Sequence, residues 1–149
     1  MVNVNKKDAI IIDIDGTLAD NLERRTQLKN NNNWEEFNSS VSKDRLNEWC
    51  REVINKFKGN YKIILVTGRR EICKSDTLMW LNNFQVHYDE IFFRGADDFR
   101  QDDIVKEEIF ITRIQDRYNI LFVIDDRLSV VKMWRRIGQV CLQCDFGDF

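Results

Sequence analysis

The chain has 149 residues, a hydrophobic content of 43% and a formal net charge of −2 at pH 7. This length is ordinary for one domain with a hydrophobic core, so we expect residues 1–149 to form a single domain. No apolar run approaches the ~20 residues of a membrane span and no signal-peptide pattern follows Met1, so we expect a cytoplasmic protein with no membrane partner.

The first predicted element is a strand over residues 9–14. The β-branched run from Ala9 to Ile12 indicates a strand that is buried on both faces, and it leads directly into Asp13 and Asp15. In open α/β sheets the carboxyl ends of strands are where ligand sites lie. Buried acids this close together are costly unless a cation or a reaction explains them. An ordinary Asp-Gly turn that closes the strand is the alternative for this segment alone.

A long connection and a helix follow. Residues 19–42 hold Trp34 and Phe37, which either cover the edge of the core or present a stacking surface to a base. A helix is predicted over residues 43–58, because its apolar residues recur on one side as a stripe that faces the core; these are Leu46, Trp49, Val53, Ile54 and Phe57.

The rest of the chain alternates buried strands with helices. The predicted strands cover residues 62–67, 90–93, 119–124 and 140–144, and the predicted helices cover 71–83, 102–116 and 128–137. This alternation predicts the α/β class, with a doubly wound parallel sheet and helices on both faces.

Three later element ends also carry polar clusters. Thr67-Gly68-Arg69-Arg70 follows the second strand, Asp102 to Lys106 opens a helix, and Asp125-Asp126-Arg127 follows a later strand. With the first acid pair, these four clusters in this order resemble the four motifs of the haloacid dehalogenase superfamily of phosphotransferases. The resemblance implies a Rossmann-like fold and a metal-dependent phosphomonoesterase.

The same resemblance implies a role for each motif residue. Asp13 would be the nucleophile that forms an aspartyl-phosphate, and Asp15 would be the general acid and base. Thr67 would donate to the phosphate and Lys106 would stabilise its charge. The implied cofactor is Mg²⁺, bound by Asp13, Asp125, Asp126 and the backbone carbonyl of Asp15.

A narrower resemblance covers nearly the whole chain. The stretches from Arg94 to Phe110 and from Asp125 to Gly138 are similar to the phosphatase domain of bacteriophage polynucleotide kinase/3′-phosphatases. This implies removal of terminal 3′-phosphate from DNA or RNA during nucleic-acid end repair, with a separate kinase or ligase as partner. Arg24 falls where that family has a functional arginine, although Arg25 adjoins it.

Arginines are expected to surround the site despite the net negative charge. A metal-dependent phosphatase needs several carboxylates at its centre, and a local basic rim can still hold phosphates. Ordinary surface ion pairs are the alternative for each arginine. Asp102 lies at i and i+4 with Lys106, where it either orients the ammonium or caps the helix. The predicted substrate-binding residues are Gly68, Arg69, Arg24, Arg94, Arg100 and Asp102.

The chain has no room for a substantial cap domain. Both windows in which such phosphatases carry a cap, residues 19–42 and 94–101, are too short for a lid with its own core. An open site suits a phosphate at the end of a large substrate. The chain also has no G-x-x-x-x-G-K-[ST] phosphate loop, so kinase activity should be absent. Two alternatives stay open: a nucleotidase or general small-molecule phosphatase, and a non-catalytic phosphate-recognition subunit of a repair complex.

The cysteines give no zinc signature. Cys141 and Cys144 have a C-x-x-C spacing, but His87 is the only histidine and no second C-x-x-C exists. Alternation in a last strand would point the two thiols to opposite faces. We expect reduced, partly buried cysteines.

Overall fold

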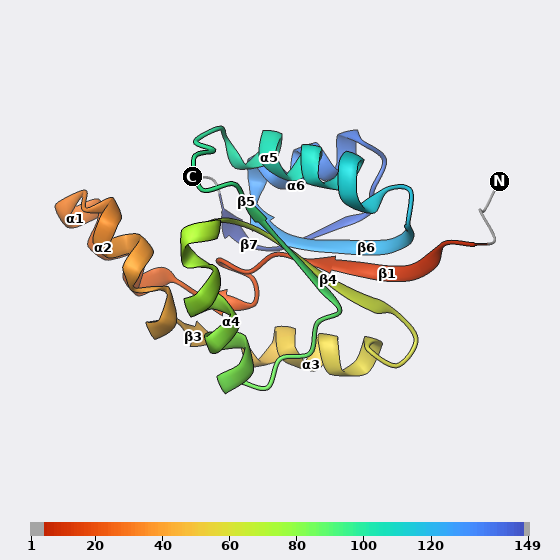
Figure 1. Cartoon of the computed structure of the whole chain (residues 1–149), viewed down its shortest axis with the longest axis horizontal. Coiled ribbons are helices and arrows are strands. Elements are labelled where there is room, and N and C mark those ends of the chain that lie inside the picture. Colours follow the sequence, from red (N-terminus) through yellow and green to blue (C-terminus); the bar gives the residue numbers. More distant parts are fainter. Residues whose placement is uncertain (1–4, 148–149) are drawn as a thin grey trace.

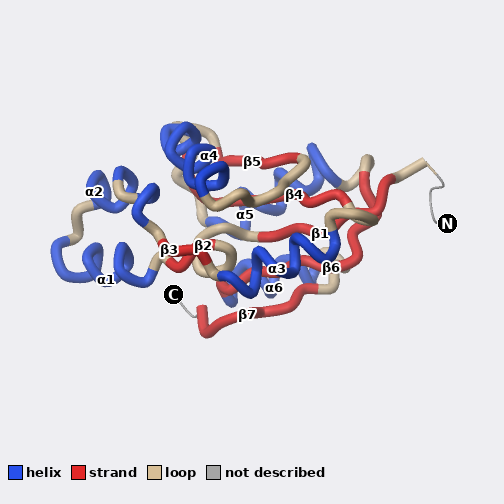
Figure 2. The backbone as a smooth tube through the Cα atoms, turned by 90° about the horizontal axis from the view of Figure 1, so that it is seen from below, coloured by secondary structure: helices blue, strands red, loops and turns tan. Residues whose placement is uncertain are grey.

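The computed structural model describes residues 5–147, so the predicted absence of a signal peptide after Met1 lies outside the described residues. Its centre is a five-stranded sheet in the order β5-β4-β1-β6-β7, with every pair parallel (Figures 1 and 2). The strands are β1 (Lys7–Ile12), β4 (Lys62–Arg70), β5 (Glu90–Arg94), β6 (Tyr118–Arg127) and β7 (Cys141–Gly147). The predicted doubly wound parallel sheet is confirmed.

Helices cover both faces of this sheet, as Figure 1 shows. On one face lie α3 (Glu48–Phe57) and α4 (Lys74–Asn83). On the other lie α5 (Asp102–Ile109), the π-helical turn Phe110–Ile114 that continues it, and α6 (Leu128–Arg136). Ala9 and Ile11 of β1 pack into the core of the α5/α6 face, and Ile10 and Ile12 pack into the other core. Strand β1 is therefore buried on both faces, as its β-branched run predicts.

The segment after β1 forms a small appendage at one end of the sheet. It contains α1 (Leu22–Asn31) and α2 (Trp34–Ser39), and its base is a two-stranded antiparallel ribbon of β2 (Ala19–Asp20) and β3 (Arg45–Leu46). Figures 1 and 2 both show the helix pair standing away from the five-stranded sheet. Arg24 is the only buried residue of α1, and α2 has none. The appendage thus has no core of its own, and the predicted absence of a substantial cap is confirmed.

One predicted helix boundary is wrong. Residues 43–58 were expected to be helical, but α3 begins at Glu48, after β3 and a 3-10 turn (Val41–Lys43). Leu46 pairs with Ala19, and the N–H of Asn47 donates to the carbonyl of Leu18 at 2.9 Å, which holds this segment extended. Tertiary pairing here overrides an apparent helical pattern.

The predicted core stripe of this helix is also only partly correct. Ile54 is buried, but Trp49 is 45% exposed, and Cys50 takes the inward position beside it. Val53 and Phe57 pack against the core as predicted, so the inward face is centred on Cys50 and Ile54, and Trp49 lies at its edge. Trp80 and Leu81 of α4 are buried in the same core, and Met133 and Trp134 of α6 are buried in the core of the opposite face.

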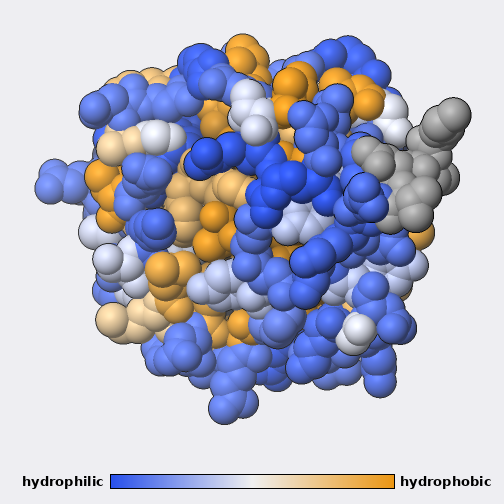
Figure 3. All heavy atoms as spheres, turned by 45° about the vertical axis from the view of Figure 1, so that its right-hand side comes forward, coloured by the Kyte–Doolittle hydropathy of each residue, from blue (hydrophilic) through white to orange (hydrophobic). Residues whose placement is uncertain are grey.

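One face of the molecule shows how polar and apolar residues are distributed on the surface. On the face drawn in Figure 3, hydrophilic residues predominate and hydrophobic residues show between them in several places. Isolated exposed apolar side chains are ordinary in folded proteins. From Asn5 to Gly147, no helix combines the length and the apolar character needed to cross a bilayer.

Candidate active site

The polar clusters predicted from the sequence meet at the carboxyl edge of the sheet. Asp13 follows β1, Thr67 lies near the end of β4, and Asp125 lies near the end of β6. Because neighbouring parallel strands end at the same edge, these side chains converge although they are far apart in sequence. Lys106 enters from the second turn of α5 and is almost completely buried beside them.

Lys106 bridges two of the aspartates. Its Nζ donates to Asp13 Oδ1 at 2.7 Å and to Asp125 Oδ2 at 2.8 Å. The hydroxyl of Thr17 donates to the second oxygen of Asp13 at 3.0 Å. Burial lowers the pKa of Lys106, but Asp125 and Asp13 outweigh it and raise this pKa well above its usual range. The lysine is therefore a permanent cation in contact with the predicted nucleophile.

Negative charge nevertheless exceeds positive charge at this point. Carboxylate oxygens of Asp13, Asp125 and Asp126 all lie within 4.8 Å of one another, and all three residues are buried. Burial, and next the charge of Asp125, raise the pKa of Asp13 well above its usual range. The same two causes raise the pKa of Asp126 to about 6. One lysine does not balance three carboxylates here.

The donor set fits a hard divalent cation. Three carboxylates that converge around one point supply the oxygen ligands that Mg²⁺ prefers, and a cation there would relieve the excess charge. Gly16 keeps this space tight, because its φ of +84° is strained for other residues and an added Cβ would collide with the Asp126 carboxylate. Within residues 5–147, this ligand cluster contains no cysteine or histidine.

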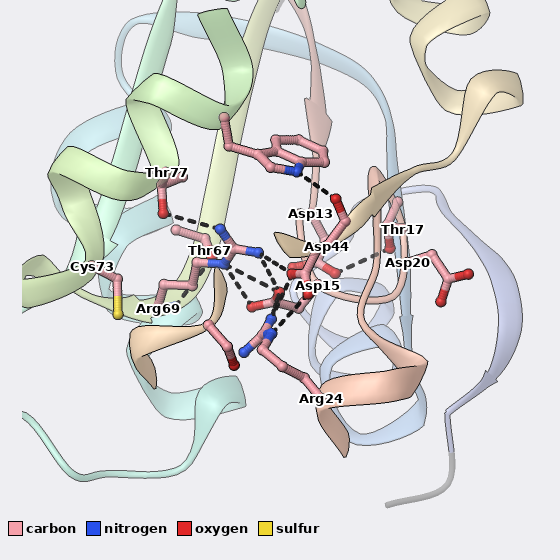
Figure 4. A network of polar contacts seen from close by, with 12 residues as sticks. Asp13, Asp15, Thr17, Asp20, Arg24, Asp44, Thr67, Arg69, Cys73 and Thr77 are labelled. Carbon is pink, nitrogen blue, oxygen red and sulfur yellow. Dashed lines mark hydrogen bonds and ion pairs between the residues drawn. The ribbon is translucent and has the colours of Figure 1, made fainter. Parts of the chain in front are cut away.

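Asp15, the predicted acid and base, points toward two arginines (Figure 4). Arg69 Nη2 and Arg24 Nη2 each donate to Asp15 Oδ1 at 2.7 Å. Burial raises the pKa of Asp15, but Arg69 and then Arg24 outweigh it and lower this pKa to about 2. Arg24, which falls where the resembling family has a functional arginine, thus reaches the site.

A buried aspartate that the sequence analysis missed completes this network. Asp44 accepts from Arg24 Nε at 2.9 Å and from Arg69 Nη2 at 2.9 Å, and Figure 4 shows the four charged side chains converging. The indole of Trp80 donates to the backbone carbonyl of Asp44 at 2.8 Å, which fixes the residue from the core side. Asp44 lies among polar residues in a segment that was predicted to be helical. No sequence pattern therefore indicated that it would pair with the two arginines.

Phe37, one of the two aromatic residues in the appendage, supports the same arginine. The guanidinium of Arg24 lies 4.4 Å from the Phe37 ring centroid and donates to the Phe37 carbonyl at 3.2 Å. The ring therefore packs against the site from the appendage. Trp34 touches the edge of Phe37 and is 59% exposed.

Thr67 lies at the carboxyl edge of the sheet, where a side chain that binds the phosphate is expected. Its side chain is fully buried, and its Oγ1 accepts the backbone N–H of Arg69 at 3.1 Å. A hydroxyl that accepts one bond keeps its own hydrogen, so Thr67 can still donate to a phosphate oxygen. Gly68 follows, and a Cβ at this position would lie 2.7 Å from a carboxylate oxygen of Asp102. Glycine is needed here because the Asp102 carboxylate packs against its backbone.

A second network surrounds Asp102. Its carboxylate accepts from Arg94 Nη2 and, at 2.8 Å, from Arg127 Nη1, whereas the Lys106 ammonium contacts Asp13 and Asp125 instead. Asp102 is the first residue of α5, and the cap position belongs to Gln101. Its contribution to Lys106 is a favourable charge interaction that helps to raise the lysine pKa.

The two outer arginines differ in position. Arg94 is buried, and besides Asp102 its guanidinium donates to the carbonyls of Gly68, Asp98 and Arg100. Arg100 is exposed on the surface and pairs with Asp98 and Glu108. Arg94 therefore braces the loops beneath the site, while Arg100 lies at its rim.

Two cysteines lie close to the site without forming a ligand set. Cys144 Sγ lies 3.5 Å from Thr17 Oγ1, and Cys141 belongs to the core of the α5/α6 face. Burial raises the pKa of Cys144 to about 11 and that of Cys141 to about 12. Both are free thiols, as expected from the sequence.

Comparison with known proteins identifies the family. A family model described as the polynucleotide kinase PNKP phosphatase domain matches residues 7–149. A protein of Autographa californica nuclear polyhedrosis virus, named as a bifunctional polynucleotide kinase/RNA ligase, is 32% identical over 133 residues. That alignment covers 85% of this chain and 18% of the viral protein.

Solved structures agree with this assignment. A chain of the Pnkp1/Rnl/Hen1 complex matches with a TM-score of 0.86 and 34% identity, over 99% of this chain and 49% of that chain. The class C acid phosphatase of Bacillus anthracis matches with a TM-score of 0.65 and 17% identity, over 86% of this chain and 55% of its own, which shows the fold alone. A haloacid dehalogenase-like hydrolase of Streptococcus pneumoniae has the same TM-score at 14% identity, over 95% and 86% of the two chains. The chain thus spans 18% of the viral protein and 49% of the chain from the Pnkp1/Rnl/Hen1 complex. It belongs to the family of polynucleotide kinase phosphatase domains, built on the haloacid dehalogenase fold.

Proposed function

We propose that residues 1–149 form a Mg²⁺-dependent phosphatase domain that removes the 3′-terminal phosphate of DNA or RNA through an aspartyl-phosphate on Asp13. The observation that carries the proposal is the buried contact of Asp13 with Lys106, 2.7 Å apart, at the acidic cluster. A carboxylate held against a permanent cation and next to a cation site is arranged to approach a phosphate dianion.

The metal part of the proposal rests on the acidic cluster. Asp13, Asp125 and Asp126 would hold Mg²⁺, together with the backbone carbonyl of Asp15. When bound, the ion supplies positive charge that offsets the charge of the phosphate.

The residues of the chain divide the remaining work. Lys106 and Thr67 bind the phosphoryl oxygens, the first through its charge and the second through its hydroxyl hydrogen. A carboxylate oxygen of Asp13 forms a bond to phosphorus as the bond from phosphorus to the sugar 3′-oxygen breaks. Asp15 gives its proton to that leaving oxygen, and it then takes a proton from the water that releases inorganic phosphate.

Asp15 can act as an acid only after its ion pairs weaken. In the free protein Arg69 and Arg24 keep its pKa at about 2, so it is ionised at neutral pH. A phosphate group that enters beside Thr67 competes with Asp15 for Arg69, because guanidinium groups bind phosphate in the same bidentate way as carboxylate. Asp44 contacts both arginines and would hold them in place during this exchange.

A polynucleotide substrate is supported by the family and by the shape of the molecule. The viral relative is named for polynucleotide kinase and RNA ligase activities, and the Pnkp1/Rnl/Hen1 complex is described as an RNA repair complex. The appendage is small, and because α1 buries only Arg24 and α2 buries no residue, it is not a lid with a core of its own. We therefore favour the end of a nucleic acid over a free mononucleotide, and a kinase or ligase as functional partner.

The test is phosphate release from a 3′-phosphorylated RNA oligonucleotide by the wild-type chain and by Asp13→Asn. Wild type is expected to release phosphate in Mg²⁺, and Asp13→Asn is expected to lose at least 99% of the rate while remaining folded. Residual activity above a tenth of wild type would exclude Asp13 as the nucleophile. A wild-type chain that binds the oligonucleotide but releases no phosphate would support a non-catalytic role instead.

A further inference from the structure

The loop that joins β5 to α5 is fastened to the end of β4, beside the phosphate-binding threonine. Arg70 Nε donates to the carbonyl of Ala96 in the loop at 2.7 Å. From the other side, Arg94 Nε donates to the carbonyl of Gly68 at 2.8 Å. Gly68 is the residue after Thr67, so these two bonds fix the position of the loop relative to the predicted phosphate site.

Phe99 stands out on this loop because it is 75% exposed. The guanidinium carbon of Arg70 lies 4.8 Å from the centroid of the Phe99 ring. The same guanidinium is bonded to Ala96, so the support behind the ring is itself anchored. One face of the ring is therefore backed by a fixed cation, and the exposed remainder is free to meet a flat partner.

Nucleobases are the flat partners that suit such a surface. Stacking of bases on aromatic side chains is how proteins bind single-stranded nucleic acid without sequence preference, because every base has a π-face. The charge of Arg70 behind the ring also favours the phosphates that accompany a base. An arginine stacked on the ring keeps the aromatic surface in one orientation, which reduces the entropy lost on binding.

We propose that the exposed face of Phe99 is a stacking site for the base of the 3′-terminal nucleotide whose phosphate is held at Asp13 and Thr67. The inference rests on the proposed function and deepens it, since it assigns the residue that recognises the nucleoside part of the substrate. It also explains how a site without a substantial cap distinguishes the end of a polynucleotide from a bare phosphate ester.

Trp34, another exposed aromatic residue, is a weaker candidate. Trp34 lies on α2, in the appendage that stands away from the sheet (Figures 1 and 2). It touches Phe37 edge-on, with ring centroids 5.4 Å apart, and reaches the site only through that ring. By contrast, Arg94 links the loop that carries Phe99 directly to Gly68, because its guanidinium donates to the carbonyls of both Asp98 and Gly68.

The experiment compares two substrates that differ only in the terminal base. One is a 3′-phosphorylated RNA oligonucleotide, and the other has the same sequence but ends in a 3′-phosphorylated abasic ribose. We measure kcat/KM for wild type, Phe99→Ala, Phe99→Leu, Phe99→Tyr and Trp34→Ala. Thermal unfolding of each variant confirms that it is folded, which is expected because the ring is mostly exposed.

Phe99→Ala is expected to lower kcat/KM by about tenfold or more on the substrate with a terminal base, the size of one base–aromatic contact. On the abasic substrate it should stay within about twofold of wild type. Phe99→Leu keeps apolar volume without a ring and should behave like Phe99→Ala, whereas Phe99→Tyr should behave like wild type.

Three results would overturn the inference. These are equal losses on both substrates for Phe99→Ala, no loss on either, and a base-dependent loss for Trp34→Ala in place of Phe99→Ala. Failure of the proposed function looks different, because the wild-type chain would then release no phosphate from either oligonucleotide.

Discussion

Lys106 Nζ lies 2.7 Å from Asp13 Oδ1, so the proposed nucleophile and a buried cation are in contact although 93 residues separate them in sequence. The contact links α5 to the loop after β1 and places the charge of the lysine where a phosphate would be attacked. The contact holds this carboxylate oxygen in a position for attack, and the positive charge of the lysine reduces the repulsion between the carboxylate and the phosphate.

Removal of this lysine should slow hydrolysis of every substrate. Lys106→Ala is expected to reduce kcat/KM by about a hundredfold or more, which is typical for loss of one electrostatic donor at a developing charge. The loss should be similar for a 3′-phosphorylated oligonucleotide and for a small aryl phosphate that makes no outer contacts. Lys132→Ala is the matched control, since Lys132 is exposed on α6. A selective loss on the oligonucleotide would contradict the assigned role.

The same substitution should destabilise the metal-free protein. Without Lys106 the buried carboxylates of Asp13 and Asp125 lose their partner, and breaking a buried pair in this way costs about 3–5 kcal/mol. Urea unfolding in a chelating buffer measures this difference in the free energy of unfolding. Added Mg²⁺ should recover part of it, because a ligand of the folded state stabilises that state.

The raised pKa of Asp126 predicts a pH dependence of stability. Burial and Asp125 raise this pKa to about 6, above the ~3.9 of an unfolded aspartate. The stability that the bound proton contributes is therefore fully present below about pH 4 and is lost as pH rises through 6. In a chelating buffer, Asp126→Asn should exceed wild type in unfolding free energy by about 2–3 kcal/mol at pH 7.5 and match it at pH 4. A difference that does not change between these two pH values would refute this reading.

The metal dependence should be specific. A general chelator such as EDTA should abolish activity and excess Mg²⁺ should restore it, because the candidate ligands are hard carboxylates. A zinc-selective chelator should have little effect, since the cysteines lie outside the ligand cluster of the described residues. Mg²⁺ should also raise the Tm of wild type more than that of Asp125→Asn. Recovery of activity with zinc alone would contradict a magnesium site and would indicate zinc binding at Cys141 and Cys144.

The two outer arginines should give different phenotypes. Arg100→Ala removes an exposed rim charge and should spare a small aryl phosphate while weakening the oligonucleotide reaction several-fold, most clearly at low salt. Arg94→Ala removes a buried brace of Gly68 and Asp102 and should lower the activity on both substrates, together with Tm. The measurement is kcat/KM on both substrates at two salt concentrations. If the two variants show the same changes in kcat/KM on both substrates at both salt concentrations, the buried Arg94 and the exposed Arg100 do not have the different roles assigned to them.

Much of the sheet and the convergence at the centre of the site could be predicted, because each strand and each polar cluster is recognised from a short stretch of sequence. The run from Ala9 to Ile12 has the composition of a strand buried on both faces, and its acids follow at once. Asp13, Thr67 and Asp125 each stand at or near the end of a strand, where parallel topology brings them to one edge, and Lys106 reaches this edge from the second turn of α5.

The rest depends on contacts that no local pattern records. Asp44 becomes part of the site only because two arginines from distant elements converge on it. Trp49 has the spacing of a core residue, but it lies at the edge of the inward face of α3 and is 45% exposed, whereas its neighbour Cys50 is buried. The burial of Arg94, which was expected to hold substrate, among backbone carbonyls could be seen only once the loops were placed, and its role toward substrate stays a prediction.

The central claim is tested most directly by comparing one phosphate in three settings. The measurement is kcat/KM for the wild-type chain in Mg²⁺ on a 3′-phosphorylated oligonucleotide, on the same oligonucleotide with a 5′-phosphate, and on the matching 3′-mononucleotide. We predict that the 3′-phosphorylated oligonucleotide is preferred to the other two by at least tenfold. Equal rates on the mononucleotide would contradict a polynucleotide phosphatase and indicate a nucleotidase, and a preference for the 5′-phosphate would contradict the assigned position of cleavage.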